Sequence, residues 1–460
     1  MSTTLTAQSD LEQWLSYLEK LHPVGIDMGL QRIQAVAERL QLKLDSVIIT
    51  VAGTNGKGST CAMLEAMLIA AGYKVGVYSS PHLQTYNERI RLNGELASDV
   101  QIVAQFDRID RARADISLTY FEFATLAGLL LFQDQQVDVA VLEVGLGGRL
   151  DAVNMIDPDC AIITSVDIDH AEYLGSDREH IGWEKAHIFR AGRPAICADP
   201  VPPPSIARYA QEIGADLWQF GQDFNYSGDQ QQWAYGGREQ RRPGLAYPAL
   251  RGANQLLNAS AAMAALESLR LRLPVPAQAL RLGLARATLP GRFQIMPGMP
   301  CVIFDVAHNP HAAGVLAQNL DSMPSYPKTV AVVGMYKDKD VAGVLRKLVG
   351  RVDHWFCASL DEPRGLSGQE LATQVRAVLD DPDLGVPEVE PEQYHPEGTR
   401  LRPAVRPMSR AVSHGPVLVS SYNCPTEAYH AARAEVGDND RIVIFGSFAT
   451  VAPVLKQVQN

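Results

Sequence analysis

The 460-residue sequence lacks the paired cysteines and the long apolar runs that mark several large classes of protein. Its six cysteines lie tens of residues apart without a C-x-x-C pair, so a zinc ribbon, a thioredoxin-type centre and a secreted disulfide framework are not expected. No uninterrupted apolar run reaches the ~18 residues of a membrane-spanning helix. Residues 1–13 hold no basic stretch followed by an apolar one, so no secretory signal is expected either.

Positive charge is also scarce. The 41 Lys and Arg residues face 52 Asp and Glu residues, which gives a net charge of −11. A general nucleic-acid surface is therefore not expected, although a local basic pocket for phosphate or carboxylate groups stays open. Together these absences predict a cytoplasmic protein that binds neither nucleic acid nor a membrane.

What the sequence does contain is a repeated alternation of short apolar runs and helix-length amphipathic segments. Apolar runs rich in β-branched residues predict buried parallel strands, and their alternation with helices predicts a doubly wound α/β sheet. The runs form a first series at 47–51, 75–78, 137–144 and 160–166, and a second at 301–304, 329–333, 354–358 and 441–445.

Two domains are expected, over residues 1–290 and 298–460, with the boundary near 288–298. The polar, aromatic stretch 223–248 favours hairpins over helix. The proline-rich stretch 387–416 is expected to be a surface insertion.

The strongest local signal is Gly-Thr-Asn-Gly-Lys-Gly-Ser-Thr at 53–60, between a predicted strand and a predicted helix. Such a turn directs backbone N–H groups and the positive end of the helix toward phosphate oxygens, and Lys57 adds a point charge. It departs from the standard P-loop, because Val51 stands at the first glycine position and Gly58 follows the lysine. A nucleotide-phosphate site is the favoured interpretation, with an ordinary glycine turn as the alternative.

Polar residues also follow three further predicted strands of the first series. Ligands of open α/β sheets collect at the carboxyl ends of strands, and carboxylates there suit Mg²⁺. Taken singly, each residue would more often be a cap or a loop residue, but beside a phosphate loop they jointly predict a Mg²⁺–nucleotide site. These residues are Ser80, Glu143, Asp167, Asp169 and His170.

Two other positions are less informative when only their pattern is considered. Lys185 has the pattern of a solvated helix lysine. Asp305 and His308 follow the first strand of the second series and precede a predicted helix, where a second ligand could bind.

At these residues the sequence resembles the bacterial dihydrofolate synthase/folylpolyglutamate synthase family of the Mur-ligase superfamily. The resemblance runs almost from end to end, from GIDMGLQR at 25–32 to Gly-Ser-Phe at 446–448. Its blocks, in order, are GTNGKGS at 53–59, SSPHL at 79–83, NERIR at 87–91, TYFEF at 119–123, EVGLGGRLDA at 143–152, DHAEYLG at 169–175, LPGRFQ at 289–294 and FDVAHNPHA at 304–312.

The resemblance implies a P-loop-containing, ATPase-type N-terminal domain with a pterin pocket, and a smaller Rossmann-like, glutamate-ligase C-terminal domain. It implies an ATP-dependent ligase that phosphorylates a substrate carboxylate, after which the amine of L-glutamate attacks the acyl phosphate. The acceptors would be 7,8-dihydropteroate and reduced folyl glutamates. ATP is required because a carboxylate is a poor electrophile, and Mg²⁺ offsets its repulsion by the γ-phosphate.

The resemblance also implies roles for individual residues. Those expected to be catalytic are Lys57, Glu143, His170 and Lys185. Those expected to bind ATP are Thr54, Asn55, Gly56, Lys57, Gly58, Ser59, Asn254, Arg292 and Asp305. Those expected to hold two Mg²⁺ ions are Ser80, Glu143, His170 and Lys185, the lysine as a CO₂-derived carbamate. Those expected to bind the acceptor or glutamate are Ile26, Asp27, Met28, Gly29, Thr119, Tyr120, Phe121, Glu122, Leu150, Asp151, Ala152 and, for glutamate, His308.

Three alternatives stay open. A monofunctional folylpolyglutamate synthase differs only in its acceptor, and the TYFEF and GIDMGL blocks favour the bifunctional form by resemblance. A P-loop switch or kinase would need no second-domain block at 305–310. A muramyl-peptide ligase is disfavoured by the folate-type blocks. Because two linked domains can form a cleft without a partner, a monomer is expected.

Overall fold

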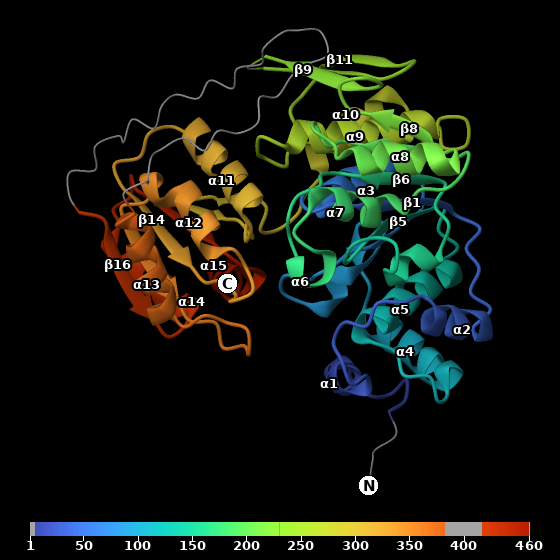
Figure 1. Cartoon of the computed structure of the whole chain (residues 1–460), viewed down its shortest axis with the longest axis horizontal. Coiled ribbons are helices and arrows are strands. Elements are labelled where there is room, and N and C mark those ends of the chain that lie inside the picture. Colours follow the sequence, from blue (N-terminus) through green and yellow to red (C-terminus); the bar gives the residue numbers. More distant parts are fainter. Residues whose placement is uncertain (1–4, 230, 382–415, 460) are drawn as a thin grey trace. The chain divides into compact units, whose positions relative to one another are not determined.

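The computed structural model describes residues 5–229, 231–381 and 416–459, which fall into two units (Figure 1). The first unit spans Met1–Ala249 and Gln255–Thr288, and the second spans Leu250–Asn254 and Leu289–Asn460. The short segment Leu250–Asn254 thus groups with the second unit, which no sequence pattern suggested. The insertion predicted at 387–416 lies outside the described residues up to residue 415.

The first unit is built on an eight-stranded sheet of order β4-β3-β2-β5-β1-β6-β7-β8. The six strands from β2 to β8 run parallel to their neighbours, and β3 and β4 extend one edge as antiparallel strands. The predicted apolar runs of the first series all supply strands of this sheet. The strands are β1 Val47–Ala52, β2 Val75–Tyr78, β3 Ile90–Leu92, β4 Glu95–Leu96, β5 Val139–Glu143, β6 Cys160–Ile163, β7 Pro194–Cys197 and β8 Asp216–Gln219.

Helices cover both faces of this sheet. On one face α1, α2, α4, α5, α7 and α8 share a large hydrophobic core with the strands, and on the other α3 and α9 pack against the sheet with α10 beside α3. Gly283 permits the α10–α3 contact, because a Cβ there would lie 2.4 Å from Met67 Cα. The helices are α1 Leu11–Leu21, α2 Gln31–Arg39, α3 Lys57–Ala70, α4 Asp99–Arg113, α5 Tyr120–Gln135, α6 Ala171–Leu174, α7 Arg178–Ala186, α8 Pro204–Ile213, α9 Gln255–Ser268 and α10 Ala277–Arg286, with 3₁₀ turns η1 Tyr86–Arg89 and η2 Ala152–Met155.

A separate three-stranded antiparallel sheet confirms the hairpins predicted at 223–248. Its order is β11-β10-β9, with β9 Asn225–Gly228, β10 Trp233–Gly236 and β11 Arg241–Leu245. Within the described chain, no helix combines the length and the apolar character needed to cross a membrane.

The second unit contains a six-stranded sheet of order β12-β13-β17-β14-β15-β16, parallel except for β12. Helices α11, α12 and α13 share one core with the sheet, and α14 and α15 pack on its strands separately. The doubly wound and Rossmann-like predictions are therefore confirmed. The elements are β12 Gln294–Met296, β13 Cys301–Phe304, α11 Pro310–Ser322, β14 Thr329–Val333, α12 Val341–Leu348, η3 Val349–Arg351, β15 His354–Ala358, α13 Gly368–Leu379, β16 Leu418–Tyr422, α14 Pro425–Glu435, β17 Arg441–Phe445 and α15 Phe448–Gln459.

Candidate active site

The predicted phosphate loop follows β1, at the point of the first sheet where the connections from two adjacent strands lead to opposite sides of the strand order. The chain passes from β1 through α3 to β2 on one side, and from the neighbouring β6 through α6 and α7 to β7 on the other. The loops after β1 and β6 are joined directly: Thr54 N donates to Ser165 O at 2.8 Å, and Asn55 N donates to Ser165 Oγ at 3.0 Å. Such a switch point is where open α/β sheets bind ligands.

Two glycines of this loop are required by its geometry. Gly53 has φ +148°, and a Cβ there would lie 1.9 Å from Thr164 Oγ1. Gly56 has φ +90°, and a Cβ there would lie 2.5 Å from Asn258 Oδ1. A side chain at either position would combine an unfavourable backbone with a clash. The loop is therefore a specialised backbone conformation directly before the N-terminus of α3.

Lys57 is the first residue of α3, and its side chain turns back over the loop. Its Nζ donates to the carbonyl oxygens of Gly53 at 2.9 Å and Thr54 at 3.3 Å. The ammonium group therefore lies beside the backbone N–H groups at the helix N-terminus, which is where an anion would bind.

Two residues of α9 that sequence reasoning missed support this loop from behind. Gln255 Nε2 donates to Ser59 Oγ at 3.4 Å, and Asn258 Nδ2 donates to Gln255 Oε1 at 3.1 Å. Asn258 is buried, in contact distance of Gly56. The available signal was an asparagine inside a largely apolar, alanine-rich helix, because a buried amide needs a specific partner.

Glu143 and Ser80 lie at the carboxyl ends of the adjacent strands β5 and β2. Glu143 is the last residue of β5, is 5% exposed, and pairs in register with Val51, two residues before Gly53. Ser80 is half-buried, two residues beyond the end of β2. The sheet therefore brings a hydroxyl and a carboxylate to the edge that carries the phosphate loop. Among the described residues, no group of three or more His, Cys, Asp or Glu side chains forms a metal cluster by itself.

Lys185 is buried, contrary to the solvated position that its pattern suggested. It lies in the last turn of α7 and is 4% exposed. Burial, followed by the nearby charge of Lys57, lowers the pKa of Lys185 to about 7, against opposing effects of Asp169, Asp151 and Glu184. The structure thus brings Lys185 within electrostatic reach of Lys57.

His170, which precedes α6, is exposed and has φ +52°.

Asp151 holds the loop that follows β5. Its carboxylate accepts hydrogen bonds from the backbone N–H groups of Leu146 at 2.8 Å, Gly145 at 3.1 Å and Val153 at 3.0 Å. Burial raises the pKa of Asp151 to about 6, although these bonds favour its charged form. Asp151, between Leu150 and Ala152, therefore determines the shape of this segment.

The predicted acceptor segments at 26–29 and 119–122 are linked by ion pairs. Asp27 Oδ2 lies 2.6 Å from Arg32 Nη1, and Arg32 Nε lies 3.3 Å from Glu122 Oε1. Glu122 is buried and closes a capping box with Thr119 at the start of α5. These two segments are 90 or more positions apart in the sequence but are neighbours in the fold.

The loop after β5 meets both of these segments. A Cβ on Gly145 would lie 2.6 Å from Phe121 Cζ, and one on Gly147 would lie 3.9 Å from Met28 Cε. The neighbouring Tyr120 ring is 5.4 Å from the Arg89 guanidinium. Ile26 is 43% exposed. The three segments predicted to bind the acceptor therefore form one region of the first unit.

In the second unit, Arg292, Asp305 and His308 lie around the carboxyl end of β13. Asp305 accepts hydrogen bonds from Phe293 N at 2.9 Å and Ala307 N at 2.8 Å. Burial raises the pKa of Asp305, and the charge of Arg292 is the main opposing effect. His308 Nδ1 lies 2.8 Å from Val306 O. Asn254 belongs to the short segment that groups with this unit.

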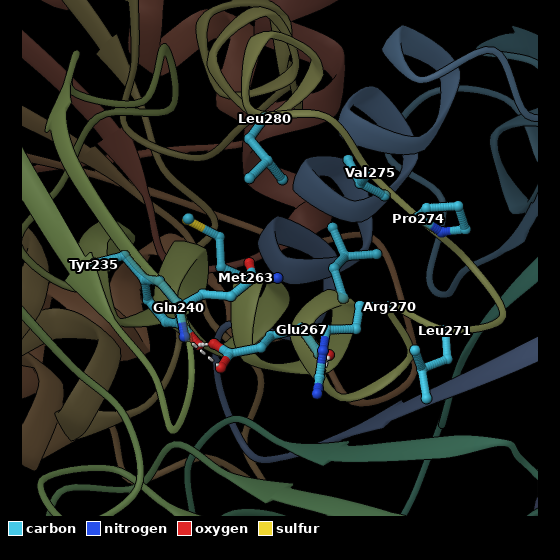
Figure 2. A pocket seen from close by; sticks show the side chains of 10 residues that line it. Tyr235, Gln240, Met263, Glu267, Arg270, Leu271, Pro274, Val275 and Leu280 are labelled. Carbon is cyan, nitrogen blue, oxygen red and sulfur yellow. Dashed lines mark hydrogen bonds between the residues drawn. The ribbon is translucent and has the colours of Figure 1, made fainter.

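A cavity of about 280 Å³ beside the three-stranded sheet contains none of the predicted site residues (Figure 2). Glu267 of α9 lies in its lining, is 2% exposed, and accepts hydrogen bonds from the Tyr235 hydroxyl at 2.7 Å and from the N–H groups of Glu239 at 2.7 Å and Gln240 at 2.9 Å. This carboxylate therefore anchors the small sheet to α9.

The chain matches two family models. Residues 51–266 match the Mur ligase middle domain, and residues 291–448 match the Mur ligase glutamate ligase domain. The first match includes the phosphate loop, Glu143 and Lys185, and the second includes Arg292, Asp305 and His308.

Curated relatives and solved structures agree with these models. The Escherichia coli dihydrofolate synthase/folylpolyglutamate synthase is 44% identical over 99% of this chain and 97% of its own length. Its counterpart from Mycobacterium tuberculosis is 35% identical over 75% and 77%. The structure of E. coli FolC in complex with DHPP and ADP covers 99% of both chains at 43% identity, with a TM-score of 0.87.

A solved bifunctional folylpolyglutamate synthase/dihydrofolate synthase with Mn, AMPPNP and L-glutamate bound covers 100% of both chains at 42% identity, with a TM-score of 0.84. Family models, full-length relatives and shared fold all point in one direction: the chain belongs to the dihydrofolate synthase/folylpolyglutamate synthase family of Mur ligases.

Proposed function

We propose that this protein is a bifunctional, ATP-dependent ligase that joins L-glutamate to 7,8-dihydropteroate, forming dihydrofolate, and to reduced folyl glutamates. ATP phosphorylates the acceptor carboxylate, and the glutamate amine then displaces phosphate to give the amide. Two relatives named for both activities, in Escherichia coli and Haemophilus influenzae, each match 97% or more of this chain.

The observation that carries the proposal is the edge of the first sheet, where a phosphate loop, a buried carboxylate and a buried lysine meet. Lys57 and the N–H groups at the start of α3 would hold the triphosphate together with Thr54 to Ser59. Preorganised donors of this kind stabilise the charge that develops as phosphate is transferred. In the second unit, Asn254, Arg292 and Asp305 are proposed to add contacts to ATP.

The residues at this edge fit Mg²⁺. The Ser80 hydroxyl and the Glu143 carboxylate are the hard oxygen donors that Mg²⁺ prefers, and they lie on adjacent strands beside the phosphate loop. We propose that His170 contributes to a second ion. When bound, the ions would offset the repulsion between the acceptor carboxylate and the γ-phosphate.

Lys185 is proposed to carry a CO₂-derived carbamate. A buried ammonium beside Lys57 is a poor metal ligand, whereas a pKa of about 7 leaves much of the amine neutral at physiological pH. The Nζ lone pair would form a bond to the carbon of CO₂, one C–O π pair would move to oxygen, and a proton would leave Nζ for water. The product is an anionic oxygen ligand that suits Mg²⁺.

The acceptor is proposed to bind where residues 26–29, 119–122 and 150–152 meet, and L-glutamate near His308. The joined segments, with Phe121 against Gly145 and Met28 near Gly147, support an apolar and aromatic pocket for the pterin. We also propose a monomer that acts in the cytoplasm. All six cysteines are free thiols, as a reducing compartment requires.

Phosphate release from ATP with L-glutamate present tests the reaction. Dihydropteroate, tetrahydrofolate and a muramyl-peptide precursor are added one at a time, and the amide product is identified by mass spectrometry. The proposal expects release and product with the first two only. Product with the muramyl precursor alone would contradict it, and release without any acceptor would indicate an ATPase or a switch.

Competition between the acceptors tests bifunctionality. One phosphate loop serving two acceptors implies that dihydropteroate inhibits ligation to tetrahydrofolate competitively. If only tetrahydrofolate gave product, the assignment of residues 119–122 to a dihydropteroate pocket would fall and the monofunctional interpretation would replace it.

A further inference from the structure

The backbone of the loop after β5 touches the last turn of α7, next to Lys185. Arg149 N donates to Glu184 O at 3.0 Å. Gly148 makes this approach possible, because a Cβ there would lie 2.8 Å from Glu184 O and 3.1 Å from Lys185 Cα. The peptide unit that joins Glu184 to Lys185 is therefore in direct contact with this loop.

The side chain of Arg149 holds the same residue a second time. Its Nε and Nη2 donate to Glu184 Oε1 at 3.1 and 2.9 Å, and its guanidinium lies 5.1 Å from the centre of the Trp183 ring. The Glu184 side chain is only 8% exposed, so its charge has little water to stabilise it. Arg149 thus fixes both the main chain and the carboxylate of Glu184.

Asn154 makes a matching contact on the other side of Lys185. Its Nδ2 donates to Arg149 O at 3.1 Å and to His187 O at 3.2 Å. Lys185 is thereby flanked by two residues, Glu184 and His187, that are both tied to the loop after β5. The same loop carries Asp151, one of the charged groups within electrostatic reach of Lys185.

From this geometry we propose that Arg149 is a positioning residue for Lys185. It holds the last turn of α7 so that Nζ is presented for carbamylation and the carbamate is kept at the metal edge of the sheet. The inference rests on the carbamylated Lys185 of the proposed function. A lysine side chain has four rotatable bonds, so the position of its end depends on a fixed backbone.

The test measures the modification directly. Wild-type protein, Arg149→Ala and Arg149→Lys are equilibrated with ¹³C-bicarbonate, Mg²⁺ and AMPPNP, and the carbamate carbon is quantified by ¹³C NMR, with Lys185→Ala as the blank. We expect the Arg149→Ala signal to fall about tenfold, the size of effect seen when partners that orient metal ligands are removed. We expect Arg149→Lys, which keeps one donor, to fall less.

Arg108→Ala is the matched control. Arg108 also forms an ion pair within the first unit, with Asp134 at 2.6 Å, but on α4 and α5 and away from α7. It should keep the full carbamate signal. Thermal melting of all variants shows which remain folded. If Arg149→Ala does not fold, Arg149→Lys still tests the inference.

Chemical rescue sharpens the result. Arg149 lines a cavity of about 540 Å³, which leaves room for a small cation to reach the position vacated in Arg149→Ala. Millimolar guanidinium should restore part of the carbamate signal and of kcat in that variant and change neither in Arg108→Ala. The KM for ATP should stay near the wild-type value throughout, because the phosphate loop is untouched.

A carbamate signal of wild-type size in folded Arg149→Ala would overturn the inference, whatever its activity. A folded Arg149→Lys variant whose carbamate signal falls below that of Arg149→Ala would do the same, because the retained donor would then have no positioning effect. Failure of the proposed function appears separately, in wild-type protein that has no carbamate signal, and the inference would then fall with it.

Discussion

The two units hold charge differently at the carboxyl ends of their parallel strands. In the first unit two cations, Lys57 and Lys185, are close enough for the charge of one to lower the pKa of the other. In the second unit an anion and a cation are neighbours, because Arg292 lowers the pKa of Asp305 against the effect of burial. Two neighbouring cations repel each other unless an anion binds between them, whereas a neighbouring anion and cation stabilise each other without a ligand.

This difference indicates what each edge is prepared to bind. At the first edge Lys57 lies beside the backbone N–H groups at the start of α3, so a triphosphate bound there would offset the effect of the Lys57 charge on Lys185. At the second edge the charge of Asp305 is opposed by that of Arg292, and the Asp305 carboxylate accepts hydrogen bonds from the backbone N–H groups of Phe293 and Ala307. We therefore expect changes in the first unit to cost more activity than equivalent changes in the second.

Lys57→Ala should produce the largest loss. It removes the cation that faces the triphosphate, and both ligase activities should fall on the order of 10²-fold or more, as when other transition-state contacts are removed. Steady-state phosphate release measures this. Lys43→Ala is the control, because the Lys43 side chain is 79% exposed and pairs with Asp45, whose side chain is 85% exposed. Near-normal turnover of Lys57→Ala would mean that the glycine turn is structural.

Lys185→Ala should lose about 10²-fold in kcat, because the proposed carbamate ligand is gone. Formate or acetate should restore part of the rate by supplying a carboxylate in the space left. A fully active alanine variant would remove Lys185 from the site.

Arg292→Ala should cost about tenfold, mainly in the KM for ATP, which corresponds to one lost charged contact. Arg351→Ala, which breaks the pair with Asp321 elsewhere in the second unit, should leave kinetics unchanged. A loss as large as that of Lys57→Ala would break the comparison between the two edges.

His308→Ala should cost about fivefold in the KM for L-glutamate, as expected for one neutral hydrogen bond. Initial rates at varied glutamate and at varied ATP separate the two constants. A rise in the KM for ATP alone would move His308 to the nucleotide.

The smallest effect is a dependence of stability on pH. Since the pKa of Lys185 is about 7 in the fold and 10.5 ordinarily, the unfolded chain binds the extra proton between these values. Stability from this group is therefore lowest below pH 7 and rises toward pH 10.5, by at most about 1.4 kcal/mol per pH unit. In metal-free, CO₂-depleted buffer, Lys185→Met should raise the Tm more at pH 6 than at pH 9. An equal rise in Tm at both pH values would mean that the Lys185 ammonium group is exposed to water in the folded protein.

Individual segments show how far sequence reasoning reached. Apolar runs such as 47–51 and 160–166 predicted strands whose observed bounds differ by at most a few residues, because a strand buried on both faces must be apolar throughout. The phosphate loop was found because its glycines are local requirements, visible in the φ angles of Gly53 and Gly56. Lys185 was the opposite case, because its sequence pattern suggested a solvent-exposed side chain and the residue is buried.

By itself, the sequence determined the two α/β series, the glycine turn before α3 and the polar residues that follow strand ends. These features depend on neighbours within a few positions, through periodicity and backbone conformation. Only the tertiary structure decided that β5 lies between β1 and β2, that Arg32 joins Asp27 to Glu122, and that Arg149 holds Glu184 beside Lys185. Apart from the Asp27–Arg32 pair, those contacts join residues far apart in the chain, so strand order and burial determine them and no local pattern encodes them.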